Sequence, residues 1–281
     1  MEILVSRILV IGGTGNIGRQ VISQLTASGA KVRALVRNLD GAHFPPQVEV
    51  MRGDLTCPDT LDSCLVGVDT VFLVWTAPAD AVAPALDRIA KHARRIVFLS
   101  APLKTPHPFF QQPNPSRALA ERIERIIEDS GLKWTFLRPG IFALNARHFW
   151  GPQIRAGNVV RWPYLAAPTA PIDERDLAEV AVLVLSEDRH AGMEYVLTGP
   201  QSLTQYEQIA AIGSVLGRSL RIEETSPEEA RRLGLPGILL DAWAAAIGQP
   251  AFVSSTFQEV TGRQARTYLE WVTRNAADFQ S

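Results

Sequence analysis

A run of closely spaced glycines near the start of the chain has the spacing of a phosphate-binding loop. Gly12, Gly15 and Gly18 lie between a β-branched apolar run at 7–11 and a helical pattern that begins at Asn16. Such glycines permit a tight turn, a close approach of backbone to a pyrophosphate, and close packing of helix on strand. The free N–H groups at the start of the helix stabilise an anion. A tight turn without ligand is the alternative, and the strand–loop–helix context favours a dinucleotide.

Two polar residues farther along the chain could complete a nucleotide site. Arg37 stands where NAD-binding folds, about twenty residues after the glycines, place an acid for the ribose 2′-hydroxyl. A guanidinium there suits the 2′-phosphate of NADP(H), and Arg19 could reach the same group. Asp54 ends the third expected strand and could accept a hydrogen bond from the adenine amino group. The alternatives are an exposed charge at a strand end for Arg37, and a turn or a helix N-cap for Asp54.

Elements that alternate along the first half of the chain must position these residues. Apolar runs that read as buried strands alternate with amphipathic helical patterns, and this order predicts a parallel sheet with right-handed crossovers. The expected strands are 7–11, 31–36, 48–51, 70–75, 95–99, 134–137 and 194–198, and the expected helices are 16–28, 80–92, 116–130 and 174–186, with a short one near Pro58.

The predicted fold class is therefore α/β, a Rossmann doubly wound parallel sheet with a smaller, discontinuous C-terminal substrate domain. The expected boundaries are 1–140 for the dinucleotide-binding domain, with its sheet continued by 171–200, and 141–281 for the substrate-binding part. Residues 201–281 are expected to form helices and loops. The long, aromatic loop 101–115 is a candidate lid over the cofactor.

Composition excludes several other classes of function. With 28 Lys+Arg against 29 Asp+Glu, the formal net charge of -1 gives no attraction to nucleic acid or to an anionic membrane. The 2 cysteines and 5 histidines show no metal-ligand spacing, so no metal is expected. No apolar stretch reaches the roughly eighteen residues of a membrane helix, and residues 1–7 do not resemble a signal peptide. We therefore expect a cytoplasmic protein, a monomer or homodimer, that acts on a small molecule.

Several motifs together resemble the atypical short-chain dehydrogenase/reductases. They are the Gly12–Gly18 spacing, Gly53-Asp54-Leu55, Ser100 after the fifth strand, and Leu137-Arg138-Pro139-Gly140. Segments 172–178 and 261–272 are similar to the branch of NmrA-like proteins and NADPH:quinone oxidoreductases. The resemblance runs from about Arg7 to Phe279 and implies an NADP(H)-dependent oxidoreductase.

The resemblance also implies roles for individual residues. The edge 75–77 and the segment 139–141 would flank the nicotinamide, and Ser100 holds the position of the catalytic serine. The implied cofactor contacts are Gly12, Thr14, Gly15, Asn16, Ile17 and Gly18 at the pyrophosphate, Arg37 at the 2′-phosphate, and Asp54 and Leu55 at the adenine.

The Tyr-x-x-x-Lys pair of that superfamily is absent from this chain. None of the 4 tyrosines has a lysine four residues later, and positions 116–121 read Ser-Arg-Ala-Leu-Ala-Glu. Because a positioned general acid contributes about 10²–10⁴-fold, another proton source is needed. Water could protonate a reduced quinone, a phenol on the substrate could serve, or Ser100, Lys104 or His107 could donate. Alternatively, the protein only senses the cofactor, as some NmrA-like regulators do.

Aromatic residues in the segments expected to cover the nicotinamide favour a large planar ligand, although they could equally pack the core of the second domain. They are Trp75, Phe109, Phe110, Phe142, Phe149, Trp150, Trp162 and Tyr164, with Arg147, Arg155 and Arg161 as the main cations. The combination resembles atypical ketoreductases that tailor polycyclic aromatic polyketides of the angucyclinone or simocyclinone type. The leading hypothesis is thus an antibiotic-tailoring NADPH-dependent ketoreductase in which Ser100 polarises or orients the carbonyl. A general quinone reductase and a non-catalytic NADP sensor are the alternatives.

Overall fold

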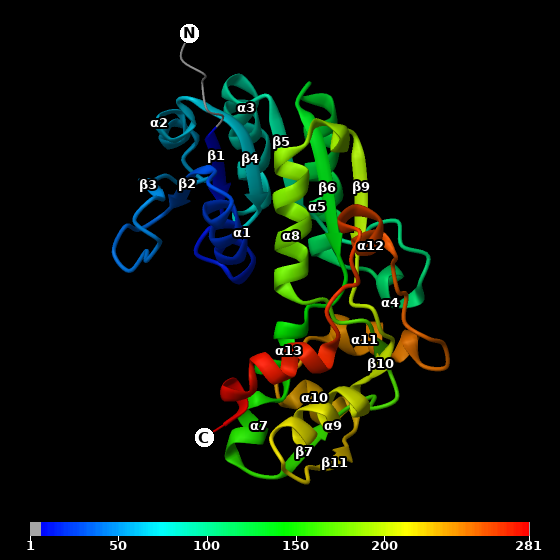
Figure 1. Cartoon of the computed structure of the whole chain (residues 1–281). Coiled ribbons are helices and arrows are strands. Elements are labelled where there is room, and N and C mark those ends of the chain that lie inside the picture. Colours follow the sequence, from blue (N-terminus) through cyan, green and yellow to red (C-terminus); the bar gives the residue numbers. More distant parts are fainter. Residues whose placement is uncertain (1–6, 281) are drawn as a thin grey trace. The chain divides into compact units, whose positions relative to one another are not determined.

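A parallel sheet of seven strands, six from the first half of the chain and one from residues 193–197, forms the first unit (Figure 1). The computed structural model describes residues 7–280, so the segment 1–6, on which the signal-peptide argument depended, lies outside it. The strands are β1 (Arg7–Ile11), β2 (Lys31–Val36), β3 (Glu49–Arg52), β4 (Val68–Val74), β5 (Arg95–Leu99), β6 (Lys133–Pro139) and β9 (Met193–Leu197). Their order, β3-β2-β1-β4-β5-β6-β9, confirms the predicted doubly wound α/β class.

Helices cover both faces of this sheet, as the alternating sequence pattern predicts. They are α1 (Asn16–Ala27), α2 (Leu61–Leu65), α3 (Val82–His92), α5 (Pro115–Asp129) and α8 (Glu174–Ser186), with 3₁₀ turns at Pro58–Thr60, Ala79–Ala81 and Asp188–His190. Each expected strand or long helix is present, with ends shifted by at most two residues. Helices α1 and α8 lie on one face in Figure 1, while α2, α3 and α5 pack on the other.

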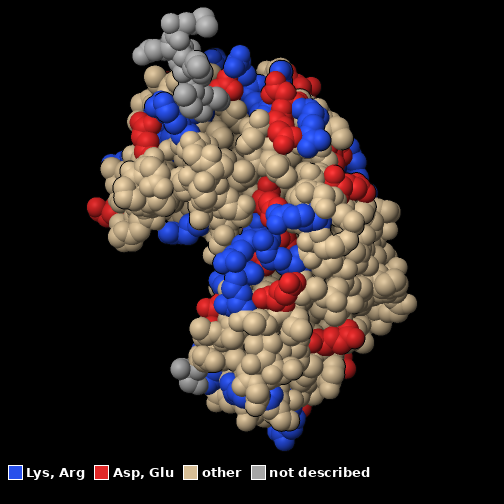
Figure 2. Space-filling view, in the orientation of Figure 1, with Lys and Arg blue, Asp and Glu red and all other residues tan. Residues whose placement is uncertain are grey.

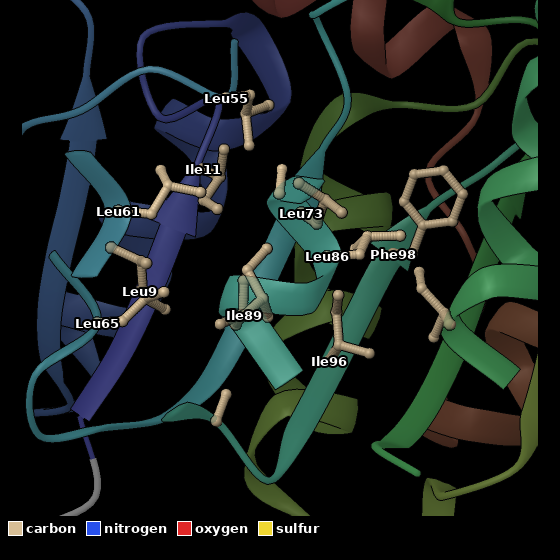
Figure 3. Close-up of a cluster of buried hydrophobic side chains, with 14 of the residues drawn as sticks. Leu9, Ile11, Leu55, Leu61, Leu65, Leu73, Leu86, Ile89, Ile96 and Phe98 are labelled. Carbon is tan, nitrogen blue, oxygen red and sulfur yellow. The ribbon is translucent and has the colours of Figure 1, made fainter. Parts of the chain in front are cut away.

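The core under α2, α3 and α5 consists almost entirely of aliphatic side chains (Figure 3). Leu9 and Ile11 of β1 point toward Leu61 and Leu65 of α2, and Ile89 of α3 lies over the neighbouring strands. Strands buried on both faces are continuous apolar runs rather than alternating ones. This packing holds the carboxyl ends of β1, β2 and β4 in a fixed arrangement at one edge of the sheet.

A second compact unit contains residues 102–115, 139–176 and 196–281. Its elements are α4 (Pro108–Gln111), α6 (Ala146–Phe149), α7 (Gly151–Ala156), β7 (Val159–Trp162), β8 (Pro168–Thr169), α9 (Gln205–Val215), β10 (Leu203–Thr204), β11 (Arg221–Glu224), α10 (Pro227–Arg232), α11 (Gly237–Ala246), α12 (Thr256–Thr261) and α13 (Tyr268–Arg274), with 3₁₀ turns at Ala143–Asn145 and Ala276–Phe279. The sequence boundaries assigned 102–115 to the range 1–140, whereas these residues cluster with the second unit.

Two small sheets in this unit correct the expectation of helices and loops alone after residue 201. β7 pairs with β11 in parallel, and β8 pairs with β10 in antiparallel. Both β10 and β11 were expected to be helix or loop. Each strand has only two to four residues, too few for a periodicity to be recognised.

A cluster of aromatic rings forms the centre of the second unit. Phe149, Trp150, Trp162 and Trp243 lie with ring centroids 5.4–6.1 Å apart. Trp150, Trp162 and Trp243 are each at most 3% exposed. The indole N–H of Trp162 donates to Gln205. A substrate wall and a core were equal alternatives for the group of aromatic residues, and Phe149, Trp150 and Trp162 pack the core of this unit.

Buried acids fix the end of the chain in the second unit. Asp176 accepts hydrogen bonds from the backbone N–H and the guanidinium of Arg266, and the indole N–H of Trp271 donates to Glu174 at 2.8 Å. Arg274 donates to Asp173 at 2.9 Å. Burial raises the pKa of the Asp176 carboxyl, against the opposing effect of Arg266. The segment 172–178, similar to the expected family, thus has a structural role here.

Charges of both signs lie in mixed groups on the face shown in Figure 2, in keeping with the near-zero net charge. Within residues 7–280, no helix is long and apolar enough to cross a membrane. The same part of the chain contains no cluster of three or more histidine, cysteine or acidic residues suited to a metal ion.

Candidate cofactor site

The glycine loop between β1 and α1 has the backbone of a phosphate-binding turn. Gly12 has φ +85°, and a Cβ there would lie 2.8 Å from the Cβ of Val74. Gly15 is the N-cap of α1 in an extended conformation, and no side chain caps this helix. The first N–H groups of α1 are therefore left for an anion. Gly18 lies against the backbone of Gly12, so α1 begins close to the end of β1.

A cavity of about 360 Å³ opens beside this loop, at the carboxyl edge of the sheet. Its walls come from the glycine loop and from residues at or just after the ends of β1, β2, β3 and β4. In open α/β sheets, ligands bind at this edge. The structure places six of the nine expected cofactor residues on the wall: Gly12, Thr14, Gly15, Arg37, Asp54 and Leu55. Asn16 is exposed at the start of α1, while Ile17 and Gly18 are buried beneath the loop.

Arg37 and Asp54 meet at the same part of the cavity wall. Arg37 is exposed directly after β2. One Asp54 oxygen accepts hydrogen bonds from the backbone N–H and the hydroxyl of Thr56, both at 2.9 Å. These bonds, with a smaller contribution from Arg37, lower the pKa of Asp54, so the group is an acceptor at neutral pH. The turn role expected as an alternative for Asp54 is thus present, together with a place on the cavity wall.

Arg19 holds the outside of the glycine loop. Its Nε donates to the Thr14 carbonyl at 2.9 Å, one Nη donates to the His43 carbonyl at 3.3 Å, and its guanidinium lies 5.8 Å from the Phe44 ring centroid. These contacts tie the segment at 43–44 to the loop. Among the described residues, Arg37 is therefore the cation that lines the cavity.

Sequence reasoning missed several residues of the wall. Thr56, after β3, and Pro78, after β4, line the cavity beside the expected residues Thr76 and Ala77. The signal that could have found them is position, because every residue that follows a parallel strand lies at this same edge.

Ser100 follows β5 directly, and its hydroxyl donates to the Glu124 carboxylate at 2.5 Å. Glu124 lies on α5, 4% exposed, and accepts hydrogen bonds from Arg138 at 2.9 Å and 2.6 Å. A serine hydroxyl has one proton, and here that proton faces Glu124. Donation to a substrate carbonyl, the expected role of Ser100, requires this bond to break, and that role stays a prediction.

His107, another expected proton donor, has both ring nitrogens engaged. Nδ1 accepts the backbone N–H of Phe109 at 3.2 Å and caps α4, while Nε2 lies 3.0 Å from the Pro250 carbonyl. A carbonyl accepts only, so the ring is the neutral tautomer with its proton on Nε2. Lys104 is exposed. All 4 tyrosines lie within residues 7–280, and none lines the cavity beside the glycine loop.

The three arginines named as the main cations near the expected aromatic residues are bonded within the second unit. Arg147 pairs with Asp278 at 2.7 Å, Arg155 donates to the Asp278 carbonyl at 2.6 Å, and Arg161 pairs with Glu223 at 2.9 Å. Two of the expected aromatic residues, Phe109 and Phe110, do line a small cavity in that unit, of about 10 Å³, which is room for roughly one water molecule.

One edge of the sheet combines a glycine loop, a cationic residue after β2 and a helix N-terminus without a side-chain cap. These features define a dinucleotide-binding protein. The model of a family described as NAD(P)H-binding matches residues 12–188, and the chain belongs to this family. A (4-alkanoyl-5-oxo-2,5-dihydrofuran-3-yl)methyl phosphate reductase of Streptomyces griseus is 36% identical, over 97% of this chain and 99% of its own. An NAD(P)H azoreductase of Xenophilus azovorans is 34% identical over the same shares, 97% and 99%.

Solved structures agree with the fold. The NADPH-dependent quinone oxidoreductase of Escherichia coli, solved with NADPH, superposes with a TM-score of 0.77 at 23% identity, over 95% of this chain and 99% of its own. The family and its reductase members make this chain an NAD(P)H-dependent oxidoreductase, which confirms the expected class and cofactor.

Proposed function

We propose that the protein reduces a conjugated small-molecule electrophile with NADPH as the hydride donor. The observation that carries this proposal is the site itself: Gly12, Gly15 and Arg37 share one cavity with Asp54, and no tyrosine lines it among the described residues. Bound NADPH would supply a hydride, and the chain supplies binding and orientation. Thr14 and Gly15 face the pyrophosphate, and Arg37 offers a cation to the 2′-phosphate.

The missing tyrosine acid points to the class of acceptor. A hydride that adds to an isolated ketone leaves an alkoxide, a strong base whose formation a general acid assists. Addition to a double bond conjugated with a carbonyl, or to a quinone, leaves an anion whose charge is spread over several atoms. Water can protonate such an anion afterwards. An electrophile of this kind therefore needs less proton donation from the protein.

The relatives support the same class. The substrate named for the Streptomyces griseus protein has a ring double bond conjugated to two carbonyl groups, and the Xenophilus azovorans protein is named for an azo group. The carbonyl of a polycyclic aromatic polyketide stays a finer prediction within this class. Fewer aromatic residues now support this finer prediction, because Phe149, Trp150 and Trp162 pack a core rather than a substrate wall.

A panel of acceptors tests the proposal. The purified protein is mixed with NADPH and, in turn, a quinone, an azo dye, an acyl-substituted unsaturated furanone, a polycyclic aromatic ketone and an isolated ketone. The near-ultraviolet absorbance of NADPH should fall with at least one conjugated acceptor and not with the isolated ketone. Turnover of the isolated ketone alone would contradict the proposal. NADPH binding without turnover of any acceptor would favour the sensor hypothesis.

A further inference from the structure

A chain of buried charges holds the Ser100 hydroxyl in one orientation. Ser100 Oγ donates to Glu124 Oε1 at 2.5 Å, and Arg138 donates from Nε to the same oxygen at 2.9 Å and from Nη2 to Oε2 at 2.6 Å. Arg138, 2% exposed, also pairs with Glu194 through Nη1. A two-point contact of this kind fixes both the plane and the position of the Glu124 carboxylate.

The charge of Glu124 decides which way the serine proton points. An O–H···O distance of 2.5 Å is typical of a hydroxyl bound to an ionised carboxylate. An ionised carboxylate can only accept, so the single proton of Ser100 is directed into the protein. The backbone N–H of Ser100 is also engaged, with the Leu137 carbonyl at 2.8 Å. What Ser100 presents toward the carboxyl edge of the sheet is therefore a pair of oxygen lone pairs.

We propose that Glu124 is a positioning residue that makes Ser100 a hydrogen-bond acceptor for an N–H or O–H group of the bound ligand. The inference rests on the proposed reductase function, and it reverses the donor role expected for this serine. Ser100 is partly exposed at the end of β5, beside β4, whose end lines the cofactor cavity. Two ligand groups have the required chemistry: the carboxamide NH₂ of the nicotinamide and a hydroxyl on the substrate.

The cofactor arm of the test is a binding measurement. The affinity for NADPH is compared with that for its reduced 3-acetylpyridine analogue, in which a methyl ketone replaces the carboxamide and removes the N–H donor. Fluorescence of the bound dihydropyridine reports affinity without turnover. If the carboxamide is the donor, the wild type prefers NADPH by about 2- to 10-fold, the range of one neutral hydrogen bond.

The substrate arm compares two acceptors that differ in one proton. A hydroxyl-substituted naphthoquinone and its methyl ether are reduced with NADPH, and KM and kcat are measured separately. If the substrate hydroxyl is the donor, the wild type has a KM about 2- to 10-fold lower for the hydroxyl compound.

Three variants separate positioning from folding. Ser100→Ala removes the acceptor and should erase the preference in whichever arm shows it. Glu124→Gln replaces one of the two accepting oxygens with an amide NH₂ group, which then faces a donor of Ser100 or Arg138. The serine is no longer held in one orientation, so the preference for the ligand with the N–H or O–H group should fall by at least half. Glu194→Gln removes the other carboxylate on Arg138 without touching Ser100, and the preference should stay. Thermal unfolding of all three identifies any variant that fails to fold.

The results that would overturn the role of Ser100 differ from those that would overturn the proposed reductase function. A wild type without preference in either arm, or a preference that survives Ser100→Ala, would overturn the inference. So would a folded Glu124→Gln variant with an unchanged preference. If no acceptor is reduced at all, the reductase proposal fails, while the cofactor arm still reports on Ser100.

Discussion

The carbonyl oxygen of Gly12 lies where a side chain on Gly18 would begin. A Cβ built on Gly18 would be 2.3 Å from that oxygen and 2.7 Å from the Cα of Gly13. Both neighbours are backbone atoms, so they cannot move aside as the end of a flexible side chain could. This contact sets how closely α1 follows β1, and it brings the N-terminal N–H groups of the helix to the cavity.

Gly18→Ala should consequently damage both the loop and cofactor binding. Forcing one methyl group into a packed contact costs about 1–3 kcal/mol of stability. The displaced helix start should also weaken NADPH binding, by roughly tenfold for each 1.4 kcal/mol of binding free energy lost. Thermal unfolding and NADPH titration measure the two effects. Gly237→Ala is the matched control, since a Cβ there has no atom within 4 Å. Unchanged NADPH affinity in Gly18→Ala would refute the role given to this contact.

Wild-type protein should bind NADPH more tightly than NADH, and Arg37→Ala should bind the two cofactors with similar affinity. A charge-assisted hydrogen bond to a phosphate contributes about 1.5–3 kcal/mol, so NADPH affinity should fall by about 10- to 100-fold while NADH affinity stays within about twofold. Arg52→Ala, at the end of the neighbouring strand and exposed, is the control and should change neither. An equal loss for both cofactors would show that Arg37 does not recognise the 2′-phosphate.

Arg266→Met should destabilise the second unit. The Asp176 carboxylate has no solvent exposure. In the variant it loses the guanidinium of Arg266 and keeps only the hydrogen bond from the backbone N–H of residue 266. Removing one partner of a buried ion pair costs about 3–5 kcal/mol, and the retained backbone bond places this case near 3 kcal/mol. Denaturant unfolding measures the loss. Arg232→Ala, exposed on α10 of the same unit, should cost less than about 0.5 kcal/mol.

Acid should destabilise the protein through His190. Burial and then the charge of Arg189 lower the pKa of this imidazole, whose Nδ1 lies 2.7 Å from the Tyr195 hydroxyl. Burial also raises the pKa of Tyr195, so the phenol keeps its proton and can donate it to Nδ1. Because the folded state binds the His190 proton more weakly than the unfolded state, the free energy of unfolding falls as the pH drops through the unfolded value of about 6.5.

The measurement is the melting temperature at about pH 7.5 and about pH 5.5. The wild type should lose more stability over this interval than His190→Gln, and the exposed His148→Gln should behave as the wild type does. An identical pH dependence in His190→Gln and the wild type would contradict the assignment.

Much of the sheet and its glycine loop could be predicted from the sequence, because each depends on neighbouring residues. Residues 8–11 of the first strand are a continuous apolar run, and Gly12 to Gly18 fix their turn locally. The aromatic residues could not be assigned, since a core and a ligand wall have the same composition. Trp162, for example, packs against Trp243, which lies about eighty residues away in the sequence.

Polar side chains were the least predictable part of the site. Arg147 was named only as a cation near the aromatic residues, and its partners Asn275 and Asp278 lie more than a hundred residues away. Ser100 was recognised by position, but its proton direction depends on Glu124, which no motif singled out. Such pairings arise from tertiary packing and leave no local pattern.

Deuterium transfer from labelled NADPH tests directly whether a cofactor held in this cavity delivers a hydride to the substrate. NADPH labelled with deuterium at the transferring carbon, in each of its two stereochemical forms, is incubated with the protein and an acyl-substituted unsaturated furanone. We expect one form alone to deliver a single deuterium to a ring carbon of the product, and we expect Gly18→Ala to slow this transfer at an NADPH concentration that does not saturate the variant. Consumption of NADPH without deuterium in the product, or equal transfer from both forms, would contradict hydride delivery from a cofactor held in this cavity.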